Sequence, residues 1–256
     1  MMLNNGNASR RQFGQHAELY RKSRTHSDQA ILNHIVELMS PNHEDKALDV
    51  GCGGGHMATA IAKETCETIA SDITPEMLVQ TGELAGEKGL KNLTLCLADA
   101  NSLPFKDDTF DVVTCRIVLH HVYNADRSVS EMKRVLKKRG TLFIQDILGI
   151  DDIQARSYMD RIEKLRDPSH IKNYNKTEWR DFLFRTGLEI AHSETVSGVY
   201  DLDEWTSRSG TAIRNVEEIE SLLQSMPETV KKHLKTSYSD GDWHISMDYI
   251  LLLAKK

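Results

Sequence analysis

The chain has 256 residues, of which 39% are hydrophobic and 27% charged, and its formal net charge is -6 at pH 7. This length supports one sizeable core, and the composition is typical of a globular protein rather than a disordered one. A mildly acidic chain lacks the broad positive field that nucleic acids attract, so we expect no nucleic-acid partner. We predict one domain over residues 1–256.

No targeting or membrane segment is visible. The N-terminus has no apolar signal segment, and no run approaches the roughly 20 apolar residues of a membrane span, so we expect a cytoplasmic protein. The cysteines form no C-x-x-C pair, which predicts no metal site and favours reduced core cysteines at Cys52, Cys66, Cys96 and Cys115. The sequence is compatible with a monomer or a homodimer.

Residues 1–40 are predicted to form an N-terminal lead followed by a helix. The first 12 residues are polar and without periodicity, which predicts a mobile tail. A helix is expected after a cap at Ser27 and before Pro41, because apolar residues recur at helical spacing at Ile31, Leu32, Ile35, Val36 and Met39.

Strands and helices alternate regularly over residues 41–146. Short apolar runs predict strands, and helical patterns follow the first, second and fourth of them. This alternation is typical of an α/β fold with a parallel sheet covered on both faces. The strands are expected at 46–50, 68–71, 93–98, 110–115 and 141–145.

The regular alternation ends after Asp146. Two further strands are expected at 188–195 and 249–253, and the segments 147–187 and 200–246 are interpreted as insertions that cover a substrate. This C-terminal half contains all three tryptophans, which either fill a core or line an acceptor pocket: Trp179, Trp205 and Trp243.

A glycine-rich turn between the first strand and its helix is the strongest functional signal. Glycines allow the backbone to approach a ligand closely, and the helix that follows begins with free N–H groups. The dinucleotide fingerprint is incomplete because His56 occupies its last position. The turn comprises Gly51, Cys52, Gly53, Gly54 and Gly55.

Two carboxylates follow later strands. Asp72 lies at the end of the second strand, 21 positions after Gly51, where an acidic side chain accepts hydrogen bonds from ribose hydroxyls. The alternative, that Asp72 caps the next helix, is less favoured because Thr74 suits that role. Asp99 ends the third strand, where it either accepts the amine of adenine or begins a solvated loop.

These segments resemble the motifs of class I S-adenosylmethionine-dependent methyltransferases. The similarity is firm over about 40–146 and extends weakly to an N-terminal lead like that of ubiquinone and menaquinone methyltransferases. Lys138 and Arg139 replace the Pro and Gly of many members. The segments that carry the resemblance are Leu48–Gly55, Ala98–Ala100, Leu103–Phe105, Phe110–Val113, Leu119–Val122, Arg134–Leu142 and Phe13–Tyr20.

The resemblance implies a Rossmann-like, seven-stranded, mostly parallel sheet with an antiparallel last strand, and S-adenosylmethionine as cofactor. It places the glycine turn beside the amino-acid part of the cofactor, with Asp49 near its ammonium group. Tyr20 either closes over the methionine end or packs as a core aromatic. The remaining implied contacts are Asp72 on the ribose, Ile73 and Met77 near the adenine, Asp99 and Ala100 at its amine, and Arg116 on the floor of the site.

The predicted reaction is methyl transfer to a small-molecule acceptor, on carbon or oxygen. Its largest catalytic contribution is alignment, worth roughly 7–11 kcal/mol, whereas a general base supplies only about 10²–10⁴-fold. His121 or His120 is the candidate base, unless both are structural. A nicotinamide-dependent oxidoreductase and a non-catalytic S-adenosylmethionine-binding module are the alternatives.

Overall fold

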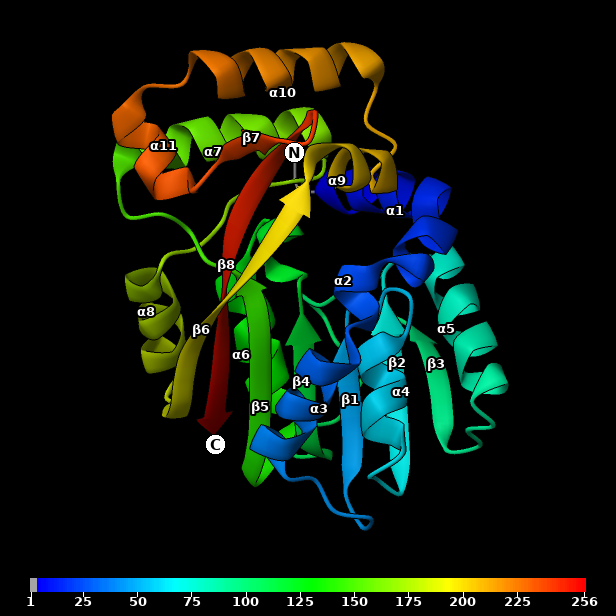
Figure 1. Ribbon diagram of the computed structural model, residues 1–256. Helices are drawn as coiled ribbons and strands as arrows, with labels where there is room; N and C mark the ends of the chain where they lie inside the picture. Colours follow the sequence, from blue (N-terminus) through cyan, green and yellow to red (C-terminus); the bar gives the residue numbers. More distant parts are fainter. Residues whose placement is uncertain (1–3) are drawn as a thin grey trace.

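The computed structural model describes residues 4–256, which are organised around one mixed β-sheet (Figure 1). Its strand order is β3-β2-β1-β4-β5-β8-β6; β1 to β5 run parallel, and β8 is antiparallel to both β5 and β6. The short β7 pairs only with β8. The strands are β1 (Lys46–Val50), β2 (Glu67–Asp72), β3 (Leu93–Leu97), β4 (Phe110–Arg116), β5 (Leu136–Ile147), β6 (Glu189–Asp201), β7 (Ser237–Ser239) and β8 (Asp242–Lys255).

This topology confirms the predicted Rossmann-like sheet with an antiparallel last strand. Strands β5, β6 and β8 are longer than the sequence suggested, and β7 was not predicted. No residue of β6 is buried, and its outer part alternates between half-buried and exposed residues. The strand expected at 188–195 therefore covers only part of β6.

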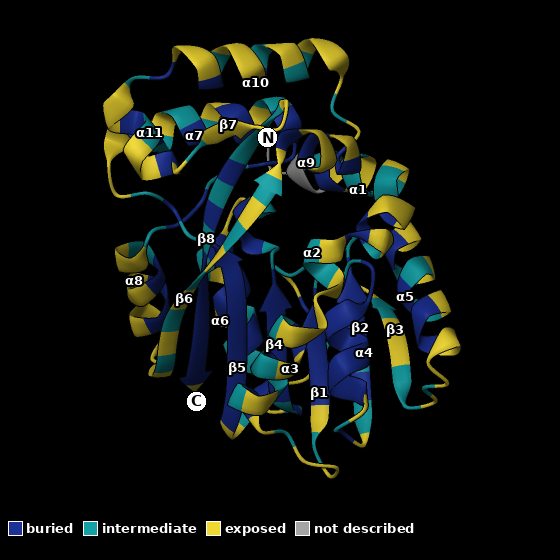
Figure 2. Ribbon diagram, in the orientation of Figure 1, coloured by how far each residue is buried: buried dark blue, intermediate teal, exposed yellow. Residues whose placement is uncertain are grey.

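Helices cover both faces of the sheet because successive side chains of a strand point to opposite faces. Ala47 packs with α3 and α4 on one face, whereas its neighbour Leu48 packs with α6 and α8 on the other. Figure 2 shows the central strands buried and the edge strand β3 more exposed. These helices are α3 (Gln29–Met39), α4 (His56–Ala62), α5 (Pro75–Glu87), α6 (Ala125–Val135) and α8 (Lys176–Thr186).

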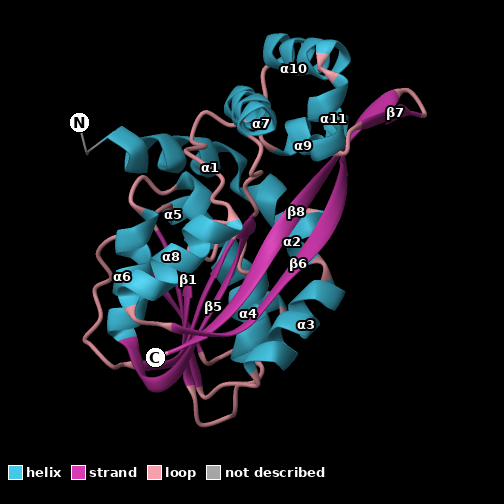
Figure 3. Cartoon of the chain, turned by 90° about the vertical axis from the view of Figure 1, so that its left-hand side faces the viewer, coloured by secondary structure: helices cyan, strands magenta, loops and turns pink. Residues whose placement is uncertain are grey.

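A helical cap lies beyond the carboxyl ends of the parallel strands (Figures 1 and 3). Within it, α7 packs against α10 and α11, and α9 packs against β6 and β8. The segment 147–187 therefore divides, since α7 belongs to the cap whereas α8 packs against α6 beside the sheet. The cap helices are α7 (Ile153–Arg166), α9 (Leu202–Arg208), α10 (Ile213–Ser225) and α11 (Glu228–Leu234).

The N-terminal lead is helical, so the prediction of a mobile tail was wrong from residue 4 onward; residues 1–3 lie outside the described part. Helix α1 (Asn4–Lys22) packs against α5, and its Phe13, Ala17 and Tyr20 form an apolar cluster with Met77. Tertiary packing thus orders a polar sequence that has little intrinsic periodicity.

Two smaller predictions also need correction. The cap of α3 is Asp28 rather than Ser27, because its carboxylate accepts the N–H groups of Ala30 and Ile31; Ser27 ends the short helix α2 (Arg24–Ser27). Cys66 is exposed and Cys96 half-buried, so only two of the four cysteines lie in the core.

Among residues 4–256, no helix combines the length and apolarity needed to cross a bilayer.

Candidate active site

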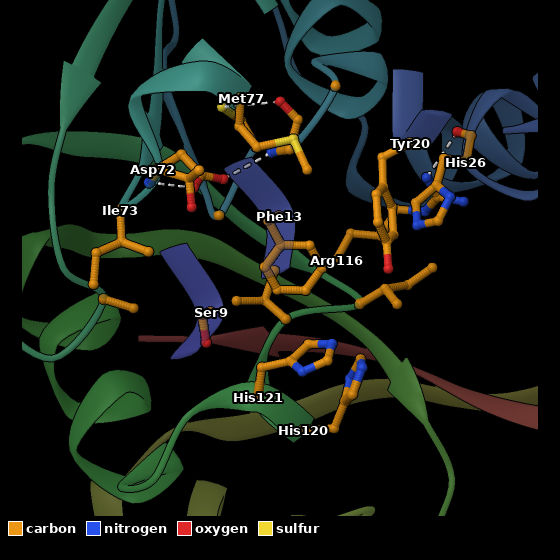
Figure 4. A pocket seen from close by; sticks show the side chains of 18 of the residues that line it. Ser9, Phe13, Tyr20, His26, Asp72, Ile73, Met77, Arg116, His120 and His121 are labelled. Atoms are coloured by element: carbon orange, nitrogen blue, oxygen red, sulfur yellow. Dashed lines mark hydrogen bonds between the residues drawn. The ribbon is translucent and has the colours of Figure 1, made fainter. Parts of the chain in front are cut away.

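A pocket lies at the carboxyl ends of β1, β2 and β4, between the sheet, the N-terminal helices and the cap (Figure 4). Gly55 does not line it; this residue instead begins α4 with a φ of 87°, close to Thr81. The other predicted residues converge there: Tyr20, Asp49, Gly51, Cys52, Gly53, Asp72, Ile73, Met77, Asp99, Ala100, Arg116, His120 and His121.

The glycine turn brings bare backbone to the pocket wall. Gly51 and Gly53 have φ angles of 71° and 53°, a region that favours glycine. A Cβ atom on Gly51 would lie 2.5 Å from Cγ2 of Val118. Strand β2 holds the turn in place, because the N–H groups of Gly51 and Cys52 both donate to the carbonyl of Ser71.

Asp72 connects this turn to the next helix. Its Oδ2 accepts the N–H of Gly53 at 3.0 Å and its Oδ1 accepts the N–H of Thr74 at 2.8 Å. Thr74 occupies the N-cap position of α5 as predicted, but its hydroxyl makes no capping bond, and Asp72 accepts the N–H of Thr74 itself. Burial raises the pKa of Asp72, while these hydrogen bonds oppose the rise. Each carboxylate oxygen retains a lone pair for a ligand hydroxyl.

Asp49 presents a buried oxygen without a hydrogen-bond partner. The residue is 1% exposed, and its Oδ1 accepts the hydroxyl of Thr114 at 2.7 Å. Among the described residues nothing donates to Oδ2. Burial raises the pKa of Asp49 to about 6. A buried carboxylate with an unsatisfied oxygen fits a cationic ligand group, because a positive charge would stabilise its ionised form.

The part of the pocket lined by Asp99 is more exposed to solvent than the part around Asp49. Asp99 is exposed, and its Oδ1 accepts the N–H of Asn101 at 2.8 Å. Ile73 and Met77 supply apolar surface nearby, with Met77 buried and Ile73 half-buried. This end can therefore hold a flat heterocycle between apolar side chains, with one polar edge facing the carboxylate.

Arg116 holds the N-terminal lead over the pocket. Its Nη1 and Nη2 donate to the carbonyls of His26 and Thr25 at 2.9 and 3.1 Å, and its Nε donates to Gln145 at 2.6 Å. The guanidinium is buried. Tyr20, from α1, is also buried and contacts the rings of Phe13 and His26 edge-on. One strand-end arginine thus fixes the position of a distant segment.

The two histidines differ in their surroundings. Nδ1 of His120 lies 2.5 Å from Oδ1 of Asp146, whose carboxylate raises the pKa of His120 although burial opposes it. Burial lowers the pKa of His121 well below its usual value, and nearby positive groups add to this effect. Nδ1 of His121 lies 3.0 Å from the Ser169 hydroxyl, and its ring contacts Phe13 edge-on, as Figure 4 shows.

The cap contributes two lining residues from α9, Trp205 and Arg208, which lie on the same face of this helix. The sequence placed residues 200–246 over a substrate and left Trp205 open between a core and an acceptor pocket. No sequence pattern assigned Arg208 to the site, although its spacing of three residues from Trp205 could have revealed their shared face. Of the three tryptophans, Trp205 alone lines the pocket, while Trp179 is fully buried in the core.

Comparison with known proteins agrees with this geometry. Residues 41–195 match a family model described as a methyltransferase domain. An uncharacterised methyltransferase of Bacillus subtilis, YcgJ, is 32% identical over 199 residues, which cover 78% of this chain and 79% of that protein. The crystal structure of a methyltransferase from Bacillus halodurans superposes with a TM-score of 0.85 at 28% identity, covering 89% of this chain and 99% of the other.

A third relative limits how far the likeness extends. The ubiquinone/menaquinone C-methyltransferase UbiE of Paraburkholderia phymatum is 36% identical over 116 residues, covering 44% of this chain and 47% of that protein. The matches to YcgJ and to the Bacillus halodurans structure cover most of the chain, and with the family model they confirm the predicted methyltransferase class. They therefore decide against a nicotinamide oxidoreductase. The chain belongs to the methyltransferase domain family and is an S-adenosylmethionine-dependent methyltransferase.

Proposed function

We propose that the pocket binds S-adenosylmethionine through the residues above and passes its methyl group to a small-molecule acceptor, on carbon or oxygen, by in-line displacement. The unpartnered Oδ2 of Asp49 carries this proposal, since the cofactor's ammonium group would satisfy it. The glycine turn would admit the amino-acid part at Gly53, because a Cβ atom there would meet nothing within 4 Å.

The adenosine part would extend toward the carboxyl ends of β2 and β3. Asp72 would accept the ribose hydroxyls while keeping its bonds to Gly53 and Thr74. Ile73 and Met77 would pack on the adenine, with Asp99 and Ala100 at its amine.

The bound cofactor supplies a methyl group on a sulfonium, already activated for transfer. The remaining task for the protein is to align an acceptor and exclude water. We assign this task to the cap, because Trp205 and Arg208 line the same pocket as the glycine turn. A continuous pocket that extends past the cofactor residues supports an enzyme over a non-catalytic binding module.

We assign the general-base role, where the acceptor needs one, to His121. Burial lowers its pKa, so the imidazole is neutral near pH 7 and can accept a proton, although the same shift makes it a weaker base. His120 is better suited to positioning, because Asp146 holds both its ring and its backbone N–H.

Calorimetric titration tests the cofactor assignment. The protein is titrated with S-adenosylmethionine, S-adenosylhomocysteine and NAD, and the titrations are repeated on Asp72→Ala and on the exposed control Asp151→Ala. We expect micromolar binding of both sulfur nucleosides, none of NAD, loss in Asp72→Ala and retention in the control. If the wild type bound neither S-adenosylmethionine nor S-adenosylhomocysteine, the proposal would be refuted.

A further inference from the structure

The charged residues that line the pocket differ in sign between the sheet and the cap, apart from Arg116 at the end of β4. The lining carboxylates, Asp49, Asp72 and Asp99, all lie on or directly after the strands β1 to β3. Two lining arginines, Arg166 and Arg208, come instead from the cap helices α7 and α9. The cap therefore contributes positive charge to the pocket and none of its lining carboxylates.

Arg208 has no carboxylate partner within ion-pair distance among the described residues. Its Nη1 donates to the hydroxyls of Ser23 and Thr25 at 2.9 and 3.0 Å. Its Nε has no hydrogen-bond partner, and the residue is only 9% exposed, so water does not supply one freely. Burial lowers the pKa of Arg208, and Arg166 lowers it further. A buried cation without a counterion is costly unless a ligand neutralises it.

Arg166 lies near enough to repel this charge, yet it is held in place. Its Nη1 donates to Glu163 at 3.0 Å, and its Nε donates to the carbonyl of Trp205 at 3.2 Å. The guanidinium stacks 4.3 Å from the centre of the Trp205 ring. Glu163 is buried behind the pocket wall and does not line it. Arg166 is therefore partly neutralised, whereas Arg208 is not.

We propose that the methyl acceptor carries an oxyanion group, a carboxylate or a phosphate, which Arg208 binds with the support of Arg166. This inference rests on the proposed function of the pocket. Guanidinium groups bind both oxyanions through paired N–H donors. The rings of Trp205, Phe13 and Tyr249 line the same pocket and provide an apolar surface for the body of the acceptor.

The methyl-transfer geometry is consistent with this position. His121 contacts Phe13 edge-on and is close enough to Arg166 for that charge to lower its pKa. An acceptor anchored on Arg208 with the support of Arg166 would thus lie beside the loop that carries the proposed base. The anchor would fix the distance between the anionic group and the methylated atom, which gives specificity as well as affinity.

Binding of matched anionic and neutral probes tests the proposal. The protein is saturated with S-adenosylhomocysteine and titrated with benzoate, octanoate and phenyl phosphate, each compared with benzamide, octanamide or phenol. We expect at least one anion to bind ten times more tightly than its neutral counterpart. A preference for phenyl phosphate over the carboxylates would identify a phosphate acceptor, and the reverse a carboxylate.

Variants locate the effect. Arg208→Met should abolish the anion preference, while Arg208→Lys should retain part of it. Arg161→Met removes an exposed arginine of the cap, which pairs with Glu218, and should change nothing. Binding of S-adenosylhomocysteine, measured on every variant, reports separately whether the cofactor site is intact, so failure of the cofactor proposal is distinguishable.

Two outcomes would overturn the inference. The first is wild-type protein that binds S-adenosylhomocysteine but prefers none of the anions. The second is an Arg208→Met variant that loses S-adenosylhomocysteine while it still binds 5′-methylthioadenosine, which has no carboxylate. That result would assign Arg208 to the carboxylate of the cofactor instead of the acceptor.

Discussion

The N–H of Gly53 donates a 3.0 Å hydrogen bond to Oδ2 of Asp72, so the glycine turn and the proposed ribose-binding residue hold each other in place. The two residues come from the ends of neighbouring parallel strands, β1 and β2, which pair directly. Parallel pairing therefore explains why a glycine turn and an acidic residue 21 positions later act together.

We predict that Gly51→Ala abolishes binding of S-adenosylhomocysteine and lowers the melting temperature. The new Cβ would meet Val118 at 2.5 Å, and the φ of 71° is strained for alanine. Gly86→Ala is the matched control, because this helical glycine has nothing within 4 Å of the added Cβ. It should preserve binding and stabilise the fold by about 0.4–1 kcal/mol. Wild-type affinity in Gly51→Ala would show that the turn tolerates a side chain.

Cofactor affinity should depend on pH through Asp49. The pKa of Asp49 is about 6 in the folded protein, above its usual value of 3.8. Protonated Asp49 therefore stabilises the cofactor-free fold at low pH. This contribution to the free energy of unfolding is lost as the pH rises through 6. A cationic ligand requires the ionised form. Binding of S-adenosylhomocysteine should therefore strengthen up to about tenfold per unit as the pH rises toward 6, then level off.

Calorimetry between pH 5 and 8 measures this dependence, and Asp49→Asn provides the comparison. The variant should bind more weakly at pH 7 and lose the steep dependence below pH 6. Equal slopes for the wild type and the variant would contradict the assignment of Asp49 to the ammonium group.

The sequence brought most of the proposed cofactor residues to one pocket because local patterns place them. Many of them lie at the end of a strand or soon after it, and parallel strands end at one edge of a sheet. A strand–turn–helix pattern thus placed Gly51, Asp72 and Asp99 together without knowledge of their contacts. The hydrogen bond from the N–H of Thr74 to Asp72 was not predicted, because the sequence assigned capping to the Thr74 side chain alone.

The cap half could not be predicted in the same way. Arg166, Trp205 and Arg208 come from helices that no short-range pattern assigns to the sheet edge. Phe13 and Tyr20 reach the pocket only because α1 packs on α5. These contacts depend on tertiary packing between distant segments, which overrides a polar local sequence.

The N-terminal lead should loosen when Arg116 is changed. Arg116→Met removes the donors to the carbonyls of Thr25 and His26 and leaves these groups without partners. Hydrogen exchange of residues 20–28 should become at least tenfold faster, and S-adenosylhomocysteine should dissociate faster. Arg180→Met, at an exposed position on α8, is the control. Unchanged exchange in this segment would show that the other contacts of the lead hold it without Arg116.

The roles of the two histidines should separate in kinetics, measured with an acceptor found among the anionic probes. His121→Ala should lower kcat by about 10²-fold, the lower end of a general base's contribution, and leave the Kd of S-adenosylhomocysteine within about twofold. His121→Gln should be equally slow, because an amide does not accept a proton. Asp146→Asn should weaken the hydrogen bond between residue 146 and the ring of His120. We expect this variant mainly to raise KM for the acceptor. If kcat is unchanged in His121→Ala, alignment by the cap alone supports the reaction, and His121 is not the base.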